Sequence, residues 1–200
     1  MKYKTAIRFL AIGFMVFCAF VARAGELPKA YVIDVREEIS PGMARKLGKA
    51  LDEAQAQKVD LVILNMNTYG GLLDAADTMR TRLMNFPIPV VAFINNNAAS
   101  AGALIAISCN RIYMTGGSSI GAATVVSGED GTQMPDKYQS YMRSTMRSTA
   151  EATGRDPIIA EAMVDDRIVI PGIIDSGYTL TFTSTEALKY GYAQGITDSR

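Results

Sequence analysis

The sequence predicts an α/β fold in which helices flank a mainly parallel sheet. From Ala30 onward, short β-branched runs alternate with helical patterns, which is typical of βα units. The run over residues 59–66 is almost continuously apolar, as expected of a strand covered on both faces. A chain of 200 residues is long enough for one such domain with its own core.

The order of the elements follows from the apolar spacing and from the positions of proline and glycine. Strands are expected over residues 30–35, 59–66, 90–94, 111–114 and 178–182, with a further candidate over 122–126. Helices are expected over residues 41–54, 72–86, 100–108, 137–153, 157–163 and 184–190. Ser40 before Pro41 signals the first helix start, Pro87 stops the second helix, and Gly154 and Gly191 close two later ones.

The N-terminal residues 1–24 have the features of a secretory signal. A basic start precedes an apolar run over residues 9–22, about 14 residues long, which is short for a membrane span. Small residues at its end place cleavage after Ala24. An uncleaved N-terminal anchor is the alternative. Either interpretation places one domain, residues 25–200, in the periplasm or on the extracytoplasmic face of a membrane.

The composition excludes several classes of function. Without residues 1–24 the chain keeps 16 basic and 20 acidic residues, which argues against nucleic-acid binding. Histidine is absent, so no Ser-His-Asp triad, Cys-His dyad or histidine-ligated zinc site can operate. Cys109 lies in an apolar segment and is expected to be a buried structural thiol. We therefore expect no metal and no cofactor.

Gly70 and Gly71 follow the carboxyl end of a predicted strand, where ligands collect in open α/β sheets. Paired glycines allow backbone N–H groups to turn toward a substrate carbonyl, as an oxyanion hole requires. An ordinary strand-to-helix turn is the alternative.

Ser100 stands among small residues just after another predicted strand and opens a helix. The N–H of Ala101 could point at the same oxyanion as that of Gly71. The alternative is that Ser100 only caps the helix.

Lys137 begins a helix after a glycine-rich loop. The positive end of the helix dipole disfavours its ammonium form, although the neighbouring Asp136 could stabilise that charge. A solvated surface lysine is the alternative. In a chain without histidine, a lysine amine is one of the few remaining bases that could activate Ser100.

These segments resemble the NfeD-type membrane-bound serine proteases of the ClpP class, relatives of signal peptide peptidase A. The resemblance rests on Gly70-Gly71, the Ala-Ala-Ser-Ala-Gly run around Ser100, residues 119–123 and the later Lys137, and it extends from about Tyr31 to Thr197. It implies a ClpP/crotonase-like fold with repeated β-β-α units, a Ser100–Lys137 dyad, and an oxyanion hole formed by Gly70, Gly71 and Ala101.

The resemblance also implies cleavage of hydrophobic peptide segments near a membrane, possibly of a stomatin-like partner, and a homo-oligomer. Tyr69 stands where family members usually have proline, so the oxyanion loop or the substrate groove could differ. Tyr69 and Tyr138 are the substrate-binding candidates, and Tyr141, Met142 and Met146 could line an adaptable apolar groove. These last residues could equally pack as ordinary core.

Two other functions stay open from the sequence. A crotonase-like acyl-CoA enzyme shares the fold and the paired-amide oxyanion hole, but the export signal and the Ser-Lys pair tell against it. A non-catalytic scaffold of a membrane protein complex is the second alternative, with Tyr69 marking decay of the site.

Overall fold

A seven-stranded, mainly parallel sheet organises the protein, and the computed structural model describes residues 27–198 of it. The expected secretory signal, residues 1–24, lies outside the described residues. The strands are β1 (Ala30–Val35), β2 (Leu61–Thr68), β3 (Val90–Ala99), β4 (Arg111–Met114), β5 (Ser119–Gly121), β6 (Thr181–Thr183) and β7 (Gly195–Ile196). The helices are α2 (Pro41–Ala56), α3 (Leu73–Met84), α4 (Ala101–Ile107), α5 (Asp136–Ala152), α6 (Pro157–Ala162) and α7 (Ser184–Lys189).

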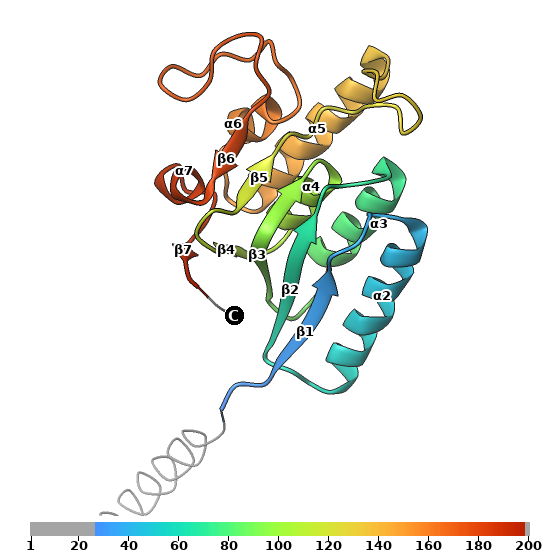
Figure 1. Cartoon of the computed structure of the whole chain (residues 1–200). Helices are drawn as coiled ribbons and strands as arrows, with labels where there is room; N and C mark the ends of the chain where they lie inside the picture. The colour runs from blue at the N-terminus through green and yellow to red at the C-terminus, as the bar shows by residue number, and fades with distance from the viewer. Residues whose placement is uncertain (1–26, 199–200) are drawn as a thin grey trace, which may run out of the picture.

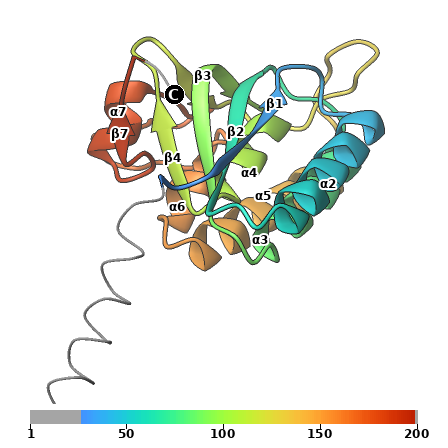
Figure 2. The same ribbon diagram turned by 90° about the horizontal axis from the view of Figure 1, so that it is seen from below.

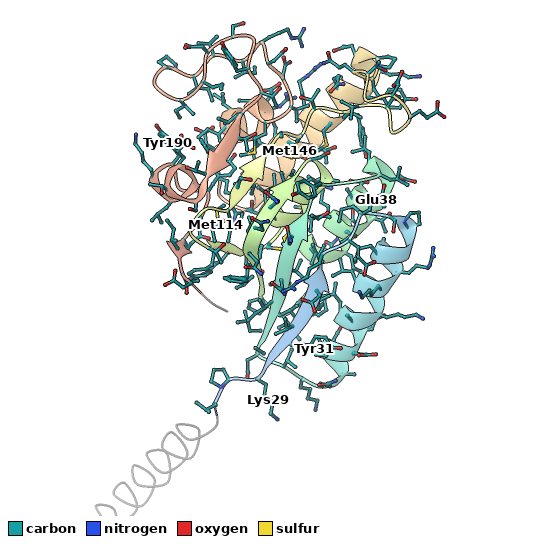
Figure 3. All side chains as sticks on the ribbon, viewed as in Figure 1. Lys29, Tyr31, Glu38, Met114, Met146 and Tyr190 are labelled. Atoms are coloured by element: carbon teal, nitrogen blue, oxygen red, sulfur yellow. The ribbon has the colours of Figure 1, made fainter. Side chains whose placement is uncertain are left out.

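The strands lie in the order β1-β2-β3-β4-β7, and every pair along this path is parallel. The strand β5 extends the sheet beside the end of β3, and β6 pairs with β5 antiparallel (Figure 1). Parallel strands end at one edge of a sheet, which is where ligands bind in open α/β folds. Figure 3 shows Glu38 at this end, whereas Lys29 and Tyr31 lie at the opposite end.

The core lies between one face of the sheet and its helices. Figure 2 shows α2, α3 and α5 on the same side of the strands. Alternate residues of β2 that face them, Val62, Leu64 and Met66, are fully buried. The other face is partly covered: Ile63 is half-buried and Val32 is 44% exposed, whereas Asn65 is fully buried. The expectation that the second strand is covered on both faces therefore holds for the helix-facing side of β2 and in part for its other side.

The predicted strand at residues 122–126 is also wrong, because the strand in this region is Ser119–Gly121. This strand has only three residues, and Ile120 is the only β-branched one, so it lacks the longer pattern that marks a strand. The strand β3 runs to Ala99, past the predicted end at Ile94. Its polar continuation over residues 95–99 looks like a loop in sequence, but parallel pairing with β5 keeps it extended.

The buried side chain of Arg155 holds the C-terminal end of α4. Its guanidinium donates to the carbonyl oxygens of Ile107 (3.1 Å), Cys109 (3.2 Å) and Tyr192 (3.3 Å). The bond to Ile107 satisfies a carbonyl that the end of α4 leaves without a partner, and the three bonds together compensate part of the cost of burying the charge. Cys109 is buried as predicted, and burial raises the pKa of its thiol to about 12. The start of α4, which carries the candidate nucleophile, thus belongs to a helix fixed at its far end.

Across residues 27–198, each helix is too short or too polar to traverse a lipid bilayer.

Asp165 joins the end of α6 to α5. Its carboxylate accepts hydrogen bonds from Arg167 Nε (2.8 Å) and Nη2 (2.6 Å), and it lies 3.4 Å from Arg143 Nη1 on α5. These hydrogen bonds, with the charges of both arginines, lower the pKa of Asp165 to about 2. A carboxyl whose pKa is lower in the folded state adds stability above its unfolded pKa, about 3.9, and this stability is lost as the pH falls toward 2.

We therefore expect Asp165→Asn to lower the free energy of unfolding by about 2 kcal/mol at pH 7, because it removes a buried, paired charge. Urea unfolding should show this deficit narrowing between pH 4 and pH 2. Asp175→Asn, at an exposed position, should stay within about 0.5 kcal/mol of the parent. If Asp165→Asn has the parental free energy of unfolding at pH 7, or if the difference between the two does not change with pH, the stabilising role assigned to the Asp165 carboxylate is contradicted.

Candidate functional site

The Gly70–Gly71 loop is fastened to the segment that precedes α2. The amide of Ile39 donates to the carbonyl of Gly70 at 2.8 Å, and the amide of Leu72 donates to the carbonyl of Ile39 at 2.8 Å. Gly71 approaches so closely that a Cβ there would lie 2.2 Å from the Ile39 oxygen, and its φ is +150°. Only glycine fits this position without a shift of the backbone.

Ser100 occupies the sharp turn between β3 and α4. Its backbone has φ 55° and ψ −124°, a conformation that side-chain-bearing residues rarely adopt. Its amide donates to the carbonyl of Gly121 at 2.9 Å, which ties the turn to β5. Ser100 is the N-cap residue of α4, but its side chain makes no capping hydrogen bond with the helix. Its hydroxyl is therefore available for chemistry, and the simple capping alternative is not supported.

The glycine loop and the serine turn touch each other. A Cβ at Gly70 would lie 2.5 Å from Ser100 Cβ and 3.0 Å from its Oγ. The amide of Gly70 already donates to Thr68 Oγ1 at 3.2 Å. By contrast, the amides of Gly71 and Ala101 donate to no protein group within residues 27–198. These two N–H groups, rather than that of Gly70, are free to bind a ligand beside the Ser100 hydroxyl.

A cavity of about 1040 Å³ opens at this point. It brings together six of the seven site residues predicted from sequence: Tyr69, Gly71, Ser100, Ala101, Lys137 and Tyr138. The seventh, Gly70, lies against Ser100. Of the predicted groove residues, Tyr141 and Met142 line the cavity, but Met146 is fully buried in the core. No three histidine, cysteine or acidic side chains converge as a metal site would need, over residues 27–198.

Lys137 reaches the cavity from the first turn of α5. Its Nζ lies over the ring of Tyr138, 5.0 Å from the centroid. The adjacent Asp136 is paired with Arg143, with Nη2 and Oδ1 3.0 Å apart. The carboxylate next in sequence to Lys137 is therefore engaged with another cation, while Lys137 itself is exposed to solvent in the absence of a substrate.

One wall of the cavity is an arm over residues 125–134 that the sequence did not reveal. The arm folds back on itself through a bridge between Val126 and Gln133. Its base is held by the buried Gln139, whose side chain accepts from the amide of Val125 (3.0 Å) and donates to the carbonyls of Val125 (2.6 Å) and Met134 (3.1 Å). A single glutamine inside an amphipathic helix pattern carries no signal of such a role, and its spacing of two residues from Lys137 puts the two side chains on different faces of the helix.

The comparison with protein families and curated proteins points to one group. The family described as NfeD1b, N-terminal domain, matches residues 29–200. The membrane protein NfeD1b of Bacillus subtilis is 36% identical over 175 residues, which cover 87% of this chain and 40% of that protein. The membrane-bound protease PH1510 of Pyrococcus horikoshii is 29% identical over 173 residues, 83% of this chain and 36% of that protein. The chain thus spans well under half the length of these relatives.

Solved structures agree on the fold. A serine-to-alanine variant of the 1510-N membrane-bound stomatin-specific protease has a TM-score of 0.76 at 25% identity, covering 87% of this chain and 82% of that one. A lysine-to-alanine variant of the same protease, in complex with a substrate peptide, has a TM-score of 0.76 at 26% identity, with coverages of 86% and 76%. ClpP1 of Listeria monocytogenes, at 18% identity and a TM-score of 0.63, covers 85% of this chain and 92% of its own. The predicted ClpP-like fold is confirmed.

The close approach of Gly71 to Ile39 leads to a stability prediction. Gly71→Ala should lower the free energy of unfolding by about 2–4 kcal/mol, because the new methyl group meets backbone atoms that cannot move aside. Gly116→Ala is the matched control, since a methyl group there would meet no atom of residues 27–198 within 4 Å. Urea unfolding of both variants measures the difference. Equal stability of the two would contradict the tight contact between the loop and Ile39.

Proposed function

Because the chain belongs to the NfeD1b N-terminal-domain family, we propose that it is a membrane-associated serine endopeptidase with a Ser100–Lys137 dyad. The observation that carries this proposal is the convergence of Ser100, Lys137 and two unengaged amides, those of Gly71 and Ala101, on one cavity. A nucleophile, a base and a pair of oxyanion donors are the groups that acyl transfer requires.

In the proposed mechanism, a neutral Lys137 takes the proton of the Ser100 hydroxyl while Ser100 Oγ attacks the peptide carbonyl. The amides of Gly71 and Ala101 hold the oxygen that becomes negative, and Lys137 then gives its proton to the leaving amine. Water, deprotonated by the same amine, then attacks the acyl carbon, and the amine gives this proton to Ser100 Oγ as the ester bond breaks. A peptide that fills the cavity would shield Ser100 and Lys137 from water.

The lining of the cavity supports an apolar substrate. Leu72, Val125, Val126, Met134 and Met142 contribute aliphatic or thioether surface, and Tyr69, Tyr138 and Tyr141 contribute rings at its wall. We propose Tyr69 and Tyr138 as substrate-binding residues. The 1510-N relative is named as specific for stomatin, which makes a hydrophobic segment of a stomatin-like membrane protein the proposed substrate here. Export through residues 1–24 to the extracytoplasmic face, and self-association, are part of the same proposal.

The charge of the cavity argues against an acyl-CoA enzyme. Its lining carries four carboxylates, from Glu38, Asp74, Asp77 and Glu129, and one amine, from Lys137. The phosphates of coenzyme A need cationic partners, and this arrangement would repel them. A non-catalytic scaffold would need neither free amides nor a strained serine, so the geometry favours the peptidase.

Replacing either member of the dyad should abolish proteolysis. With a fluorogenic peptide of apolar residues as substrate, Ser100→Ala and Lys137→Ala should each lower kcat/KM by about 10³-fold or more. The exposed Ser144→Ala and Lys49→Ala serve as matched controls and should keep parental activity. Cleavage by Ser100→Ala at the parental rate would exclude this serine as nucleophile, and the same result for Lys137→Ala would exclude this lysine as base.

Tyr69 should act on binding more than on the chemical step. It is 80% exposed on the lining of the cavity, so its ring can cover an apolar substrate side chain without being needed for folding. Tyr69→Ala should raise KM about fivefold for the apolar peptide, as expected for roughly 1 kcal/mol of lost contact, with kcat changed less than twofold. Tyr178→Ala, exposed outside the cavity, is the control. An unchanged KM would remove Tyr69 from the substrate site.

A further inference from the structure

Thr68 links the glycine loop to the segment before α2 through its side chain. It is the last residue of β2 and only 2% exposed. Its hydroxyl donates to the carbonyl of Glu37 at 2.8 Å and accepts from the amide of Gly70 at 3.2 Å. The carbonyl of Gly70 lies farther from Oγ1, at 3.5 Å. Because the hydroxyl has one proton, the shorter contact to Glu37 receives it.

The two hydrogen bonds on Gly70 determine where the Gly71 amide points. The Gly70 carbonyl and the Gly71 N–H belong to one planar trans peptide and point in opposite directions. Since the carbonyl accepts from the amide of Ile39, the Gly71 N–H is directed away from Ile39. The neighbouring peptide is fixed by Thr68 Oγ1 at the Gly70 amide. Without that bond, the Tyr69–Gly70 peptide would lose its hydrogen bond at a glycine, where the backbone can adopt a wide range of angles.

The methyl group of Thr68 contacts the other half of the site. A Cβ at Gly102 would lie 2.7 Å from Thr68 Cγ2, so the start of α4 packs directly on this methyl group. Ala101, whose amide is the second proposed donor, precedes Gly102. Threonine is branched at Cβ and has a stiff χ1 angle, so its hydroxyl and methyl group keep a fixed spacing. One side chain therefore touches both segments that carry the free amides.

We propose that Thr68 is a positioning residue that aligns the amides of Gly71 and Ala101 on the oxyanion. This inference rests on the proposed peptidase function. Thr68 lies beneath the cavity and does not line it, so it acts on the reaction through the two amides. Its hydroxyl holds the Tyr69–Gly70 peptide, which adjoins the peptide that carries the Gly71 N–H, and its methyl group sets the distance to α4. Loss of the hydroxyl should therefore slow the chemical step and leave peptide binding nearly unchanged.

Comparing four residues at position 68 separates the effect of the hydroxyl from that of the methyl group. Threonine carries hydroxyl and methyl, Thr68→Val keeps only methyl groups, Thr68→Ser keeps only the hydroxyl, and Thr68→Ala has neither. With the apolar fluorogenic peptide, Thr68→Val should lower kcat by about 10- to 100-fold with KM within twofold, less than the loss of a whole oxyanion donor. Thr68→Ser should stay within about fivefold of the parent, and Thr68→Ala should be at least as slow as Thr68→Val.

The results separate this inference from the function on which it rests. Suppose that the parent shows Ser100-dependent cleavage. If Thr68→Val then keeps more than half of the parental kcat, or if Thr68→Ser loses as much kcat as Thr68→Val, the positioning role of Thr68 is overturned while the proposed peptidase function is retained. If the parent shows no Ser100-dependent cleavage, the proposed peptidase function and the positioning role of Thr68 are both overturned. Thermal unfolding checks that each variant is folded. If Thr68→Val does not fold, the role of the hydroxyl is tested by comparing kcat of Thr68→Ser with kcat of Thr68→Ala. A ratio near one overturns the inference.

Discussion

The site depends on the contact between the Gly70–Gly71 loop and the segment that precedes α2. Three hydrogen bonds join them: one from Thr68 Oγ1 to Glu37, one from the amide of Ile39 to Gly70, and one from the amide of Leu72 to Ile39. This pairing continues the parallel alignment of β1 and β2 beyond the strand ends, but with the register shifted by one residue, since Val35 pairs with Met66 and Ile39 pairs with Gly71. It leaves the Gly71 amide unengaged next to Ser100, where a substrate carbonyl could accept from it.

The rest of the fold brings the reactive side chains to that contact. Parallel pairing of β3 with β5 holds Ser100 in its strained turn, since the Ser100 amide donates to Gly121. Arg155 fixes the far end of α4, and Gln139 fixes the arm over residues 125–134 to α5. Strain of this kind persists only where the surroundings hold it in place. The glycine loop, the serine turn and the arm are thus secured by hydrogen bonds that do not involve the Ser100 hydroxyl or the Lys137 amine.

Much of this arrangement could be predicted from the sequence, because it depends on local patterns. The strand Ala30–Val35 and the strand Arg111–Met114 have the predicted bounds, and the glycine pair, Ser100 and Lys137 each follow or open a predicted element. The contacts that the sequence did not reveal are long-range. Thr68 and Glu37 are 31 residues apart, so their hydrogen bond follows only from the sheet register. Gln139 likewise needs the folded arm before its buried amide has partners.

The crystal structure of the protein after reaction with a peptidyl phosphonate ester tests the proposed site most directly. We expect a covalent bond from phosphorus to Ser100 Oγ, with the phosphonyl oxygen about 3 Å from the nitrogen atoms of both Gly71 and Ala101. We also expect the Lys137 amine to lie on the same side of the cavity as the adduct. A phosphonyl oxygen that faces solvent, or a protein that leaves Ser100 unmodified, would contradict the proposed chemistry.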